Sequence, residues 1–542
     1  MSVATERGRV WLAAAAGMLL ALAAFTLASP VINEDAVQYL DLADAWRSGQ
    51  WSTALSTYWS PLYSWALAVV LAVARPLPAN ELLAVRAFNL AVFAVVLALW
   101  LSLVRRLVND EDRGGSYLRA WWWWVLASLL ASWVVLQTVG IDAATPDLMA
   151  TALLLAAALI LVRLRETDAR ATDGLVLGLA IGGAALARAA LVILVPVAAL
   201  LLRRVTPPRL RVPTMVAFAI GVACTFGVFV SALSYDEQRW TLGDTGRLNY
   251  AWFVNGVPRY VHWQGDEPGS GVAAHPTRVA RQPDLFVFDP AWPCAFPPSC
   301  NPGYWHQGLR LHFDVSEQWA ASRWVLDQWR WVVMERLAGV PLVVLVLALA
   351  ADRRGLTGPA ARICLAVAAA AAVSYLGVYS EARHVAGALL LVLAPALAAL
   401  RRPRPVARWG GLVLLCLVTA LAIRSLQSSW QRQQYEGAKT HPQWAIAEQL
   451  ARAGVPAGGR VARIGEAPGT YWARLGHLRI VAEIPAADEF WRASPDTQAA
   501  RMQRLEAAGV LAVVADGRAL PVPPGWIRVA GAPWVIVHRV GR

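Results

Sequence analysis

Eleven apolar runs divide this chain of 542 residues, and they constrain its fold more than any other feature. An apolar helix of about 20 residues is long enough to cross the hydrocarbon core of a bilayer, which is ~30 Å thick. Hydrophobic residues make up 57% of the chain and charged residues only 16%, against roughly 25% charged residues in soluble proteins. An ordinary soluble protein is therefore excluded. The runs occupy residues 10–29, 83–104, 120–139, 148–162, 174–187, 189–202, 214–233, 331–351, 361–378, 386–400 and 409–426.

The basic residues indicate how these runs cross the membrane. Arg7 and Arg9 precede the first run, which places the N-terminus inside. A cleaved signal peptide is the alternative, but the apolar part of such a signal is usually only ~7–15 residues long. If the runs alternate in direction, the short basic connections all fall on the inner side, as the positive-inside rule requires. These connections are residues 105–119, 163–173, 203–211, 352–362 and 401–408.

We therefore expect a mainly α, polytopic bundle of about eleven spans in the cytoplasmic (inner) membrane, with the N-terminus inside. The apolar stretch 61–74 is short, and counting it as a span would reverse the direction of every later span. We therefore interpret it as a helix in the outer interface. The net charge of +13 would suggest nucleic acid in a soluble protein. Here nearly all of the excess lies in the inner connections, so it is an orientation signal and no nucleic-acid partner is expected.

The outer segments differ from one another in composition. The first outer loop covers residues 30–82, and the large outer loop, 234–330, is rich in Trp, Tyr, Pro, His and Gly. We expect the large loop to be an irregular cap without a sheet of its own. The tail alternates short β-like runs with helical stretches, which predicts a small α/β domain outside the membrane, over 427–542, beside a membrane module over 1–426. The β-like runs are 460–464, 478–482, 510–514 and 534–538, and the helical stretches are 444–453 and 495–508.

Two cysteines of the large outer loop, Cys294 and Cys300, are separated by a short gap on the oxidising side of the membrane. This spacing favours a disulfide that closes a small loop, with two free thiols as the alternative. The histidines of the same loop match no zinc spacing. The sequence predicts no metal site.

The first outer loop carries the strongest candidate for catalysis. Glu34 and Asp35 follow the first span directly, and Tyr39 and Trp46 recur behind them at helical spacing. This pattern predicts an amphipathic helix in the interface. A carboxylate beside hydrocarbon loses part of its hydration, which suits it to removing a proton from an acceptor hydroxyl. The alternative is that the two acids only cap this helix.

A second acidic segment follows the third span and faces the same side. It contains Asp142 and, five residues later, Asp147. Pro146 suits the first turn of the next span, with Thr145 as its cap and Asp147 favoured by the helix dipole. Asp147 therefore has an adequate structural explanation, whereas Asp142 has none.

Two arginines lie on the outer side, against the positive-inside bias. Arg188 divides two short apolar runs and should occupy the outer turn of a helical hairpin, where a lipid phosphate or Asp142 could pair with it. Snorkelling to the headgroups is the alternative. Arg383 and His384 lie in a second outer turn, in which Arg383 could bind phosphate or pair with Glu381.

Together these residues resemble the GT-C superfamily of multi-span glycosyltransferases, which take a sugar from a polyprenyl-phosphate carrier on the outer membrane face. Bacterial protein-mannosyltransferases and aminoarabinose transferases are the most similar group. The resemblance covers about residues 10–205 and, more loosely, 370–400. It rests on Asp35 four positions before Tyr39, on Pro61-Leu62-Tyr63, on Pro146-Asp147-Leu148, on Arg188 in its hairpin and on Arg383.

The resemblance implies an inverting transfer of a sugar from the carrier to a glycan, lipid or protein acceptor, without metal or other cofactor. By it, Asp35 is the general base with Glu34 beside it. Asp142, Asp147 and Tyr39 then shape the acceptor or donor site, while Arg188, Arg383 and His384 hold the carrier phosphate. The rival functions are a transporter or flippase, for which the chain lacks evident repeats, and a non-catalytic scaffold of envelope assembly.

Overall fold

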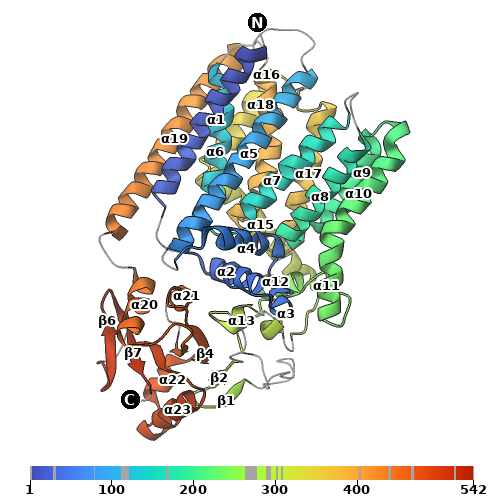
Figure 1. Ribbon diagram of the computed structural model, residues 1–542. Helices are drawn as coiled ribbons and strands as arrows, with labels where there is room; N and C mark the ends of the chain where they lie inside the picture. The colour runs from blue at the N-terminus through green and yellow to red at the C-terminus, as the bar shows by residue number, and fades with distance from the viewer. Residues whose placement is uncertain are drawn as a thin grey trace.

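The computed structural model shows a bundle of long helices with a small sheet domain at one end (Figure 1). It describes residues 3–28, 32–77, 80–111, 121–165, 170–259, 261–262, 277–288, 294–300, 303–306, 309–353, 355–401, 405–437, 441–465, 469–517 and 521–540. The bundle helices are α1 (Val3–Thr26), α5 (Glu81–Glu111), α6 (Trp121–Thr138), α7 (Asp147–Arg163), α8 (Ala171–Ala187), α9 (Leu194–Val205), α10 (Arg211–Val222), α11 (Val228–Asp236), α15 (Val315–Trp331), α16 (Val340–Ala351), α17 (Pro359–Leu376), α18 (Ala386–Ala399) and α19 (Pro405–Gly437).

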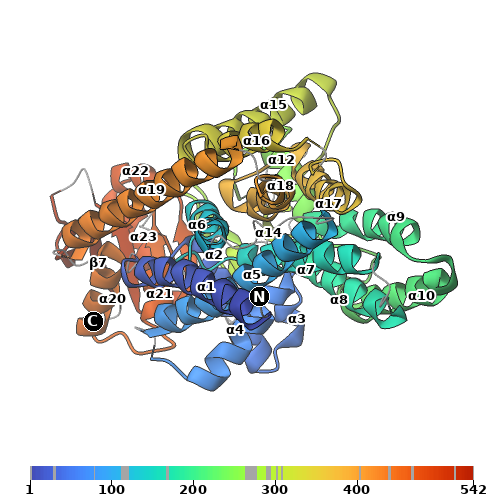
Figure 2. The same ribbon diagram turned by 90° about the horizontal axis from the view of Figure 1, so that it is seen from above.

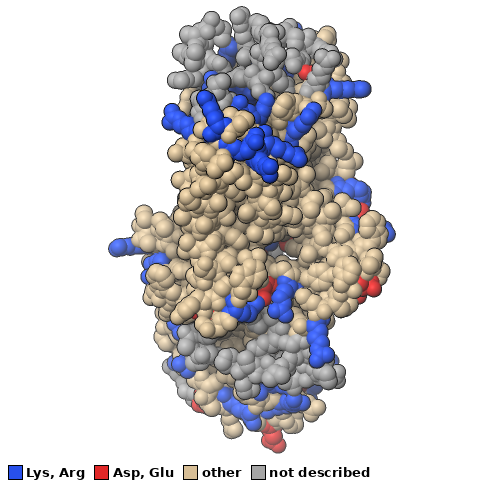
Figure 3. Space-filling model, turned by 90° about the vertical axis from the view of Figure 1, so that its right-hand side faces the viewer, with Lys and Arg blue, Asp and Glu red and all other residues tan. Residues whose placement is uncertain are grey.

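Every expected apolar run coincides with a helix, and the predicted mainly α membrane bundle is confirmed. By length and composition, six of the described helices can cross a membrane, or seven if one bent pair counts as a span. The other expected spans do not meet both criteria, so the number eleven stays a prediction. Arginines gather at the end of the bundle where α1 begins, an uncharged belt follows, and charges return beside the sheet domain (Figure 3). The chain is a multi-pass membrane protein.

The expected span 331–351 differs from the structure. A helix begins earlier, at Val315, inside the stretch expected to be irregular, and continues through a π-helical turn (η5, Val332–Arg336). It then bends by 85° before α16. Ala338 and Gly339 both have positive φ angles, of 47° and 68°, and Pro341 follows in the first turn of α16. A left-handed pair followed by proline ends one helix and starts another.

Two short helices lie across the end of the bundle that meets the sheet domain, roughly perpendicular to α5 and α7 (Figure 1). They are α2 (Glu34–Arg47) and α4 (Pro61–Ala74), joined through α3 (Trp51–Ala54). Both were predicted as interface helices. Their inner faces are apolar and fully buried, as Leu40 and Leu67 illustrate, so they form a floor between the bundle and the sheet domain.

Helix α8 packs against α10 at one edge of the bundle (Figure 2). Glycines at four-residue spacing, Gly174 and Gly178, let the two backbones approach. A Cβ built on Gly178 would lie only 2.2 Å from the carbonyl oxygen of Phe218. This close packing fixes α8, at whose end Arg188 breaks the helix before the 3₁₀ turn η2 (Ala189–Ile193).

The tail forms the predicted α/β domain, but its sheet is larger than the tail alone. The strand order is β1-β2-β4-β3-β5-β7-β6, with β3 parallel to β4 and β5. Strands β1 (Arg278–Ala280) and β2 (Leu285–Val287) come from the large outer loop and pair antiparallel with each other, and β2 also pairs antiparallel with β4. In the described part of the loop, both strands belong to the sheet of the tail, which the loop therefore extends.

The remaining elements complete the domain and the loop. Other secondary structure consists of α12 (Thr245–Phe253), α13 (Pro297–Cys300), α14 (Gly303–His306), α20 (Pro442–Arg452), β3 (Arg460–Ile464), α21 (Tyr471–Leu475), β4 (Arg479–Ile484), α22 (Ala487–Arg492), α23 (Pro495–Ala507), β5 (Ala512–Asp516), β6 (Trp526–Val529) and β7 (Ala532–Arg539), with the short turns η3 (Pro208–Leu210), η4 (Ala223–Gly227) and η6 (Ala382–Val385). The bundle-facing side of the sheet shares one apolar core with α2 and α4, through Trp472, Ile480 and Leu40.

One buried arginine of the tail fastens the domain to this floor. Arg474 of α21 is 7% exposed, and its Nη1 lies 2.5 Å from Asp41 Oδ1. Its Nη2 lies 2.9 Å from Asp44 Oδ2, and its Nε lies 2.8 Å from Glu81 Oε2. Asp41 also accepts a hydrogen bond from the backbone N–H of Ala295, at 2.8 Å. The guanidinium therefore joins α2, α5 and the tail.

We expect the substitution Arg474→Met to lower the free energy of unfolding by about 3–5 kcal/mol, because it leaves buried carboxylates without their cation. Thermal unfolding of the purified full-length protein in detergent measures this. Arg492→Met is the matched control, because the Arg492 side chain is 83% exposed and lies 3.7 Å from Asp488. Equal unfolding temperatures for the two variants would contradict the anchoring role.

Candidate functional site

Four of the predicted residues meet at the end of the bundle below α7. Arg188 holds Asp147 with two contacts, Nε to Oδ1 at 2.9 Å and Nη2 to Oδ2 at 2.5 Å. Arg383 Nη2 lies 2.9 Å from Asp35 Oδ2, and Arg383 Nε lies 3.8 Å from Asp147 Oδ2. The four side chains thus form a row of alternating charge, in the order Arg188, Asp147, Arg383 and Asp35. It joins segments that are up to 348 residues apart.

The helix starts explain how the two carboxylates come to face this cluster. Asn33 occupies the N-cap position of α2, and its side-chain oxygen accepts a hydrogen bond from the Ala144 N–H at 3.1 Å. Asp35 is thus in the first turn of α2 and is not the cap. Helix α7 begins at Asp147 with Pro146 at its N-cap position, one residue later than a Thr145 cap predicts. Both acids lie at helix N-termini, which stabilise negative charge.

The other side of the site is formed by η6 and the residues just before it. Glu381 Oε2 lies 2.7 Å from Arg383 Nε, and Glu381 Oε1 accepts a hydrogen bond from the Tyr379 hydroxyl. The Glu381 N–H donates to His384 Nδ1 at 3.1 Å, and the His384 ring stacks on Tyr375 with ring centroids 4.6 Å apart. His384 thus faces the cluster from inside the bundle, beside the arginine. The sequence left open whether Arg383 pairs with Glu381, and the structure shows that it does.

Tyr39 lies one helical turn after Asp35 and is buried. Its ring packs edge to face against Trp59 and Tyr63, with centroids 5.2 and 5.3 Å apart. Asp35, Tyr39, Arg188, Arg383 and His384 line one cavity of about 440 Å³, which we call the arginine cavity.

A second cavity, of about 560 Å³, meets the first at Asp35 and is walled by the tail. We call it the aromatic cavity. Glu34, Asp35, Trp59 and Trp305 line it together with Arg463. Gly469 of the tail approaches Glu34 so closely that an added Cβ would lie 2.6 Å from Glu34 Oε1. Glu34 and Asp35 are adjacent in sequence, but only Asp35 lines both cavities.

A buried ion-pair network supports the aromatic cavity. Glu483 Oε1 lies 2.7 Å from Arg463 Nη2, and Glu483 Oε2 lies 3.3 Å from His262 Nε2. Arg463 also lies over the ring of Phe296, 4.1 Å from its centroid. Burial by itself would raise the pKa of the Glu483 carboxyl, but Arg463 and His262 outweigh it and hold that pKa below its ordinary value.

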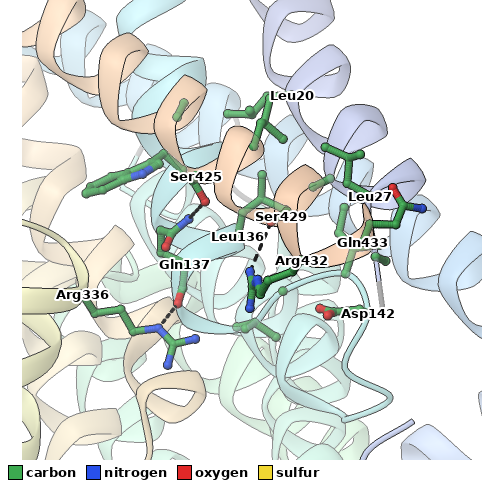
Figure 4. Close-up of a pocket in the computed structure, with 18 residues that line it drawn as sticks. Leu20, Leu27, Leu136, Gln137, Asp142, Arg336, Ser425, Ser429, Arg432 and Gln433 are labelled. Carbon is green, nitrogen blue, oxygen red and sulfur yellow. Dashed lines mark hydrogen bonds between the residues drawn. The ribbon is translucent and has the colours of Figure 1, made fainter. Parts of the chain in front are cut away.

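The remaining candidates lie away from the cluster. Asp142 lines a separate hollow between α1, α6 and α19 (Figure 4). The suggested pairing of Arg188 with Asp142 is therefore wrong, because Asp147 occupies the guanidinium. Cys294 and Cys300 form a disulfide. Their sulfur atoms lie near the Asp41 carboxylate, but the disulfide and Arg474 already engage these groups, and the absence of a metal stays a prediction.

Sequence reasoning missed several residues of the site. Tyr375 and Tyr379 line the arginine cavity, and the Arg463–Glu483 pair supports the aromatic cavity. Tyr379 had a usable signal, because it lies two residues before Glu381 in the same outer turn. Arg463 and Glu483 had none, since their role depends on how the tail meets α2.

Comparison with known proteins identifies the fold. No protein-family model and no curated protein sequence matches the chain. The crystal structure of apo ArnT, an aminoarabinose transferase from Cupriavidus metallidurans, is similar with a TM-score of 0.58 and 14% identity, over 99% of this chain and 98% of that one. The same protein bound to undecaprenyl phosphate gives a TM-score of 0.53 and 12% identity, over 98% of this chain and 97% of that one.

The archaeal oligosaccharyltransferase AglB from Archaeoglobus fulgidus gives a TM-score of 0.48 and 12% identity, over 94% of this chain and 69% of that one. The two ArnT structures match nearly the whole chain, tail included. The expectation of a GT-C type architecture is thus confirmed as a fold.

The pKa of Glu483 predicts how acid affects stability. Because that pKa is lowered in the folded protein, the ionised carboxyl stabilises the fold above its unfolded pKa, and this contribution is lost as the pH falls through the folded pKa. We expect Glu483→Gln to lower the unfolding temperature near neutral pH and to lower it by a shrinking amount below about pH 4.5. Thermal unfolding across this range measures it.

Glu489→Gln provides the control, since Glu489 is exposed on α22 of the same domain. A pH-independent difference between wild type and Glu483→Gln would contradict the assignment.

Proposed function

We propose that the protein is a glycosyltransferase that moves a sugar from a polyprenyl-phosphate carrier to an acceptor on the outer face of the cytoplasmic membrane. One observation carries the proposal: Asp35 lies where the arginine cavity and the aromatic cavity meet. A base must reach the acceptor hydroxyl while the donor carbon lies within attack distance. A carboxylate shared by two cavities meets this requirement.

The arginine cavity suits the donor phosphate. Arg188 and Arg383 line it, and guanidinium groups suit the geometry of phosphate oxygens. A large apolar groove of about 710 Å³ lies beside it, lined by Leu62 of α4 and Leu186 of α8. These residues are two positions from Ser60 and Arg188, which line the arginine cavity. The groove would take the isoprenoid chain, and a neighbour of the same fold is bound to undecaprenyl phosphate.

The charge cluster suggests how the carrier prepares the base. In the structure Arg383 holds Asp35 at 2.9 Å. A phosphate bound at Arg383 would compete for the same guanidinium and leave Asp35 free to accept a proton, while Asp147 keeps Arg188 in place. The base would then become available only when the donor is present.

The reaction would be a single in-line displacement that inverts the sugar. The acceptor oxygen attacks the anomeric carbon from the aromatic cavity, and its proton passes to Asp35. The bond between the carbon and the phosphate oxygen breaks, and its electron pair remains on the carrier phosphate beside Arg188 and Arg383. Fixed cations at a developing negative charge lower the barrier. The chain's own residues supply the base and these cations.

The aromatic cavity would receive the acceptor. Trp59, Trp305 and Phe296 line it, and flat apolar rings suit the faces of sugars or the side chains of a peptide. Whether the acceptor is a glycan, a lipid or a protein, it enters between the bundle and the tail. The positions of the basic connections support an inside N-terminus, about eleven spans and a tail outside.

We expect Asp35→Asn to reduce sugar transfer by roughly 10²–10⁴-fold, because it removes the general base. Glu34→Gln should retain most of the rate, since Glu34 lines the aromatic cavity alone. Membranes supplied with labelled carrier-linked sugar provide the measurement.

Asp488→Asn, an exposed exchange in the tail, serves as the control, because the Asp488 side chain is 81% exposed. Unchanged sugar transfer by the Asp35→Asn variant would contradict the assignment of Asp35 as the general base. Wild-type membranes that moved the carrier but transferred no sugar would favour a flippase.

We further expect Arg383→Gln to raise the KM for the carrier by roughly tenfold or more, because each charged hydrogen bond to phosphate contributes about 1.5–3 kcal/mol. The kcat should fall less than the KM rises. Steady-state kinetics with a carrier titration separates the two. Arg247→Gln is the control, since Arg247 is 55% exposed beside Asp244. An unchanged KM would contradict phosphate binding at Arg383.

A further inference from the structure

A polar groove lies at the domain end of the bundle, between α1, α6, α19 and the π-helical turn before α16 (Figure 4). Its volume is about 240 Å³, the size of a headgroup rather than of a whole lipid. Among the described residues it shares no wall with the arginine cavity, the aromatic cavity or the apolar groove. The proposed function does not use it.

Two arginines from different helices line this groove. Arg336 donates a hydrogen bond from Nε to the carbonyl oxygen of Gln137, which orients its guanidinium. Arg432 Nη2 donates to Ser429 Oγ at 3.3 Å. Both contacts use one nitrogen of a guanidinium that has three, so each arginine keeps donors for an anion. Asp142 is exposed at the same groove and contributes one negative charge.

The sides of the groove are apolar and continue onto surfaces that face lipid. Leu20, Leu27 and Leu136 contribute apolar side chains to the lining of the groove. Leu19 of α1 is 66% exposed and Ile423 of α19 is 51% exposed, as expected for residues that contact acyl chains.

The level of the groove in the membrane follows from its neighbours. Trp430 of α19 is 54% exposed and lies two residues before Arg432. Exposed tryptophan marks the headgroup level of a bilayer. The two arginines therefore lie at the depth of lipid phosphates, with hydrocarbon on one side.

We propose that this groove binds the phosphate group of a membrane phospholipid, through Arg336 and Arg432, while an acyl chain lies along α1 and α19. The charge pattern supports this occupant: two cations and one carboxylate leave a net positive site for a singly charged phosphodiester. Asp142 opposes the anion, so removing its charge strengthens the site.

Native mass spectrometry of the full-length protein in detergent tests the proposal, with dimyristoylphosphatidylglycerol as the probe. The wild type retains one such lipid, and the double variant Arg336→Gln, Arg432→Gln binds it roughly tenfold more weakly. Asp142→Asn binds it more tightly than the wild type. The double variant Arg323→Gln, Arg330→Gln, which removes two exposed arginines of α15, behaves as the wild type.

Three outcomes overturn the proposal. The first is equal retention of dimyristoylglycerol, which lacks the phosphate. The second is displacement of the phospholipid by millimolar inorganic phosphate, which identifies a free anion as the occupant. The third is equal binding by the two double variants. If the double variant at the groove fails to fold, the Asp142→Asn exchange still decides, because unchanged or weaker binding contradicts the site. Sugar transfer is not measured, so the result is independent of the proposed function.

Discussion

The buried contact of Arg474 with Asp41, Asp44 and Glu81 is the interaction on which the arrangement of the site depends. Helix α2 carries Asp35 at its start and Asp41 less than two turns later. Arg474 of the tail therefore binds α2, the same helix that carries the candidate base. Together with the apolar core shared by the sheet and α2, this contact places the tail residues that wall the aromatic cavity beside Asp35. Buried ion pairs contribute little net stability, but they demand one geometry.

Burying the charge cluster of the arginine cavity at this depth costs free energy, and its positive and negative charges offset one another. Two guanidiniums face three carboxylates, those of Asp35, Asp147 and Glu381. Charges at the level of a membrane bundle persist mainly where they have a function. Asp147 is the best satisfied of the three and is only 2% exposed, whereas Asp35 is 39% exposed. The same cluster thus contains one carboxylate that is buried among cations and one that remains open to a cavity.

The sequence was sufficient for features that depend on local pattern. Apolar runs predicted the bundle helices, and a four-residue spacing placed Asp35 and Tyr39 on one helix face. The bend at Gly339 also had a local signal, a glycine followed closely by Pro341, which the span assignment overlooked. The partner of Arg188 could not be derived, because Asp142 and Asp147 lie in the same short acidic segment and only the start of α7 selects one. Arg474 had no local signal, since all of its partners are about 400 residues away.

The mixed origin of the sheet has a consequence for how the protein is made. Strands β1 and β2 leave the ribosome about 190 residues before β4, their nearest partner in the tail. Protein synthesis adds about 5–20 residues per second. Strands β1 and β2 therefore lack their partner in the tail for roughly ten to forty seconds, while several further spans are synthesised. Without these strands the edge of β4 is open, and open strand edges invite aggregation. The complete sheet therefore forms late, because it needs strands from two segments that are far apart in the sequence.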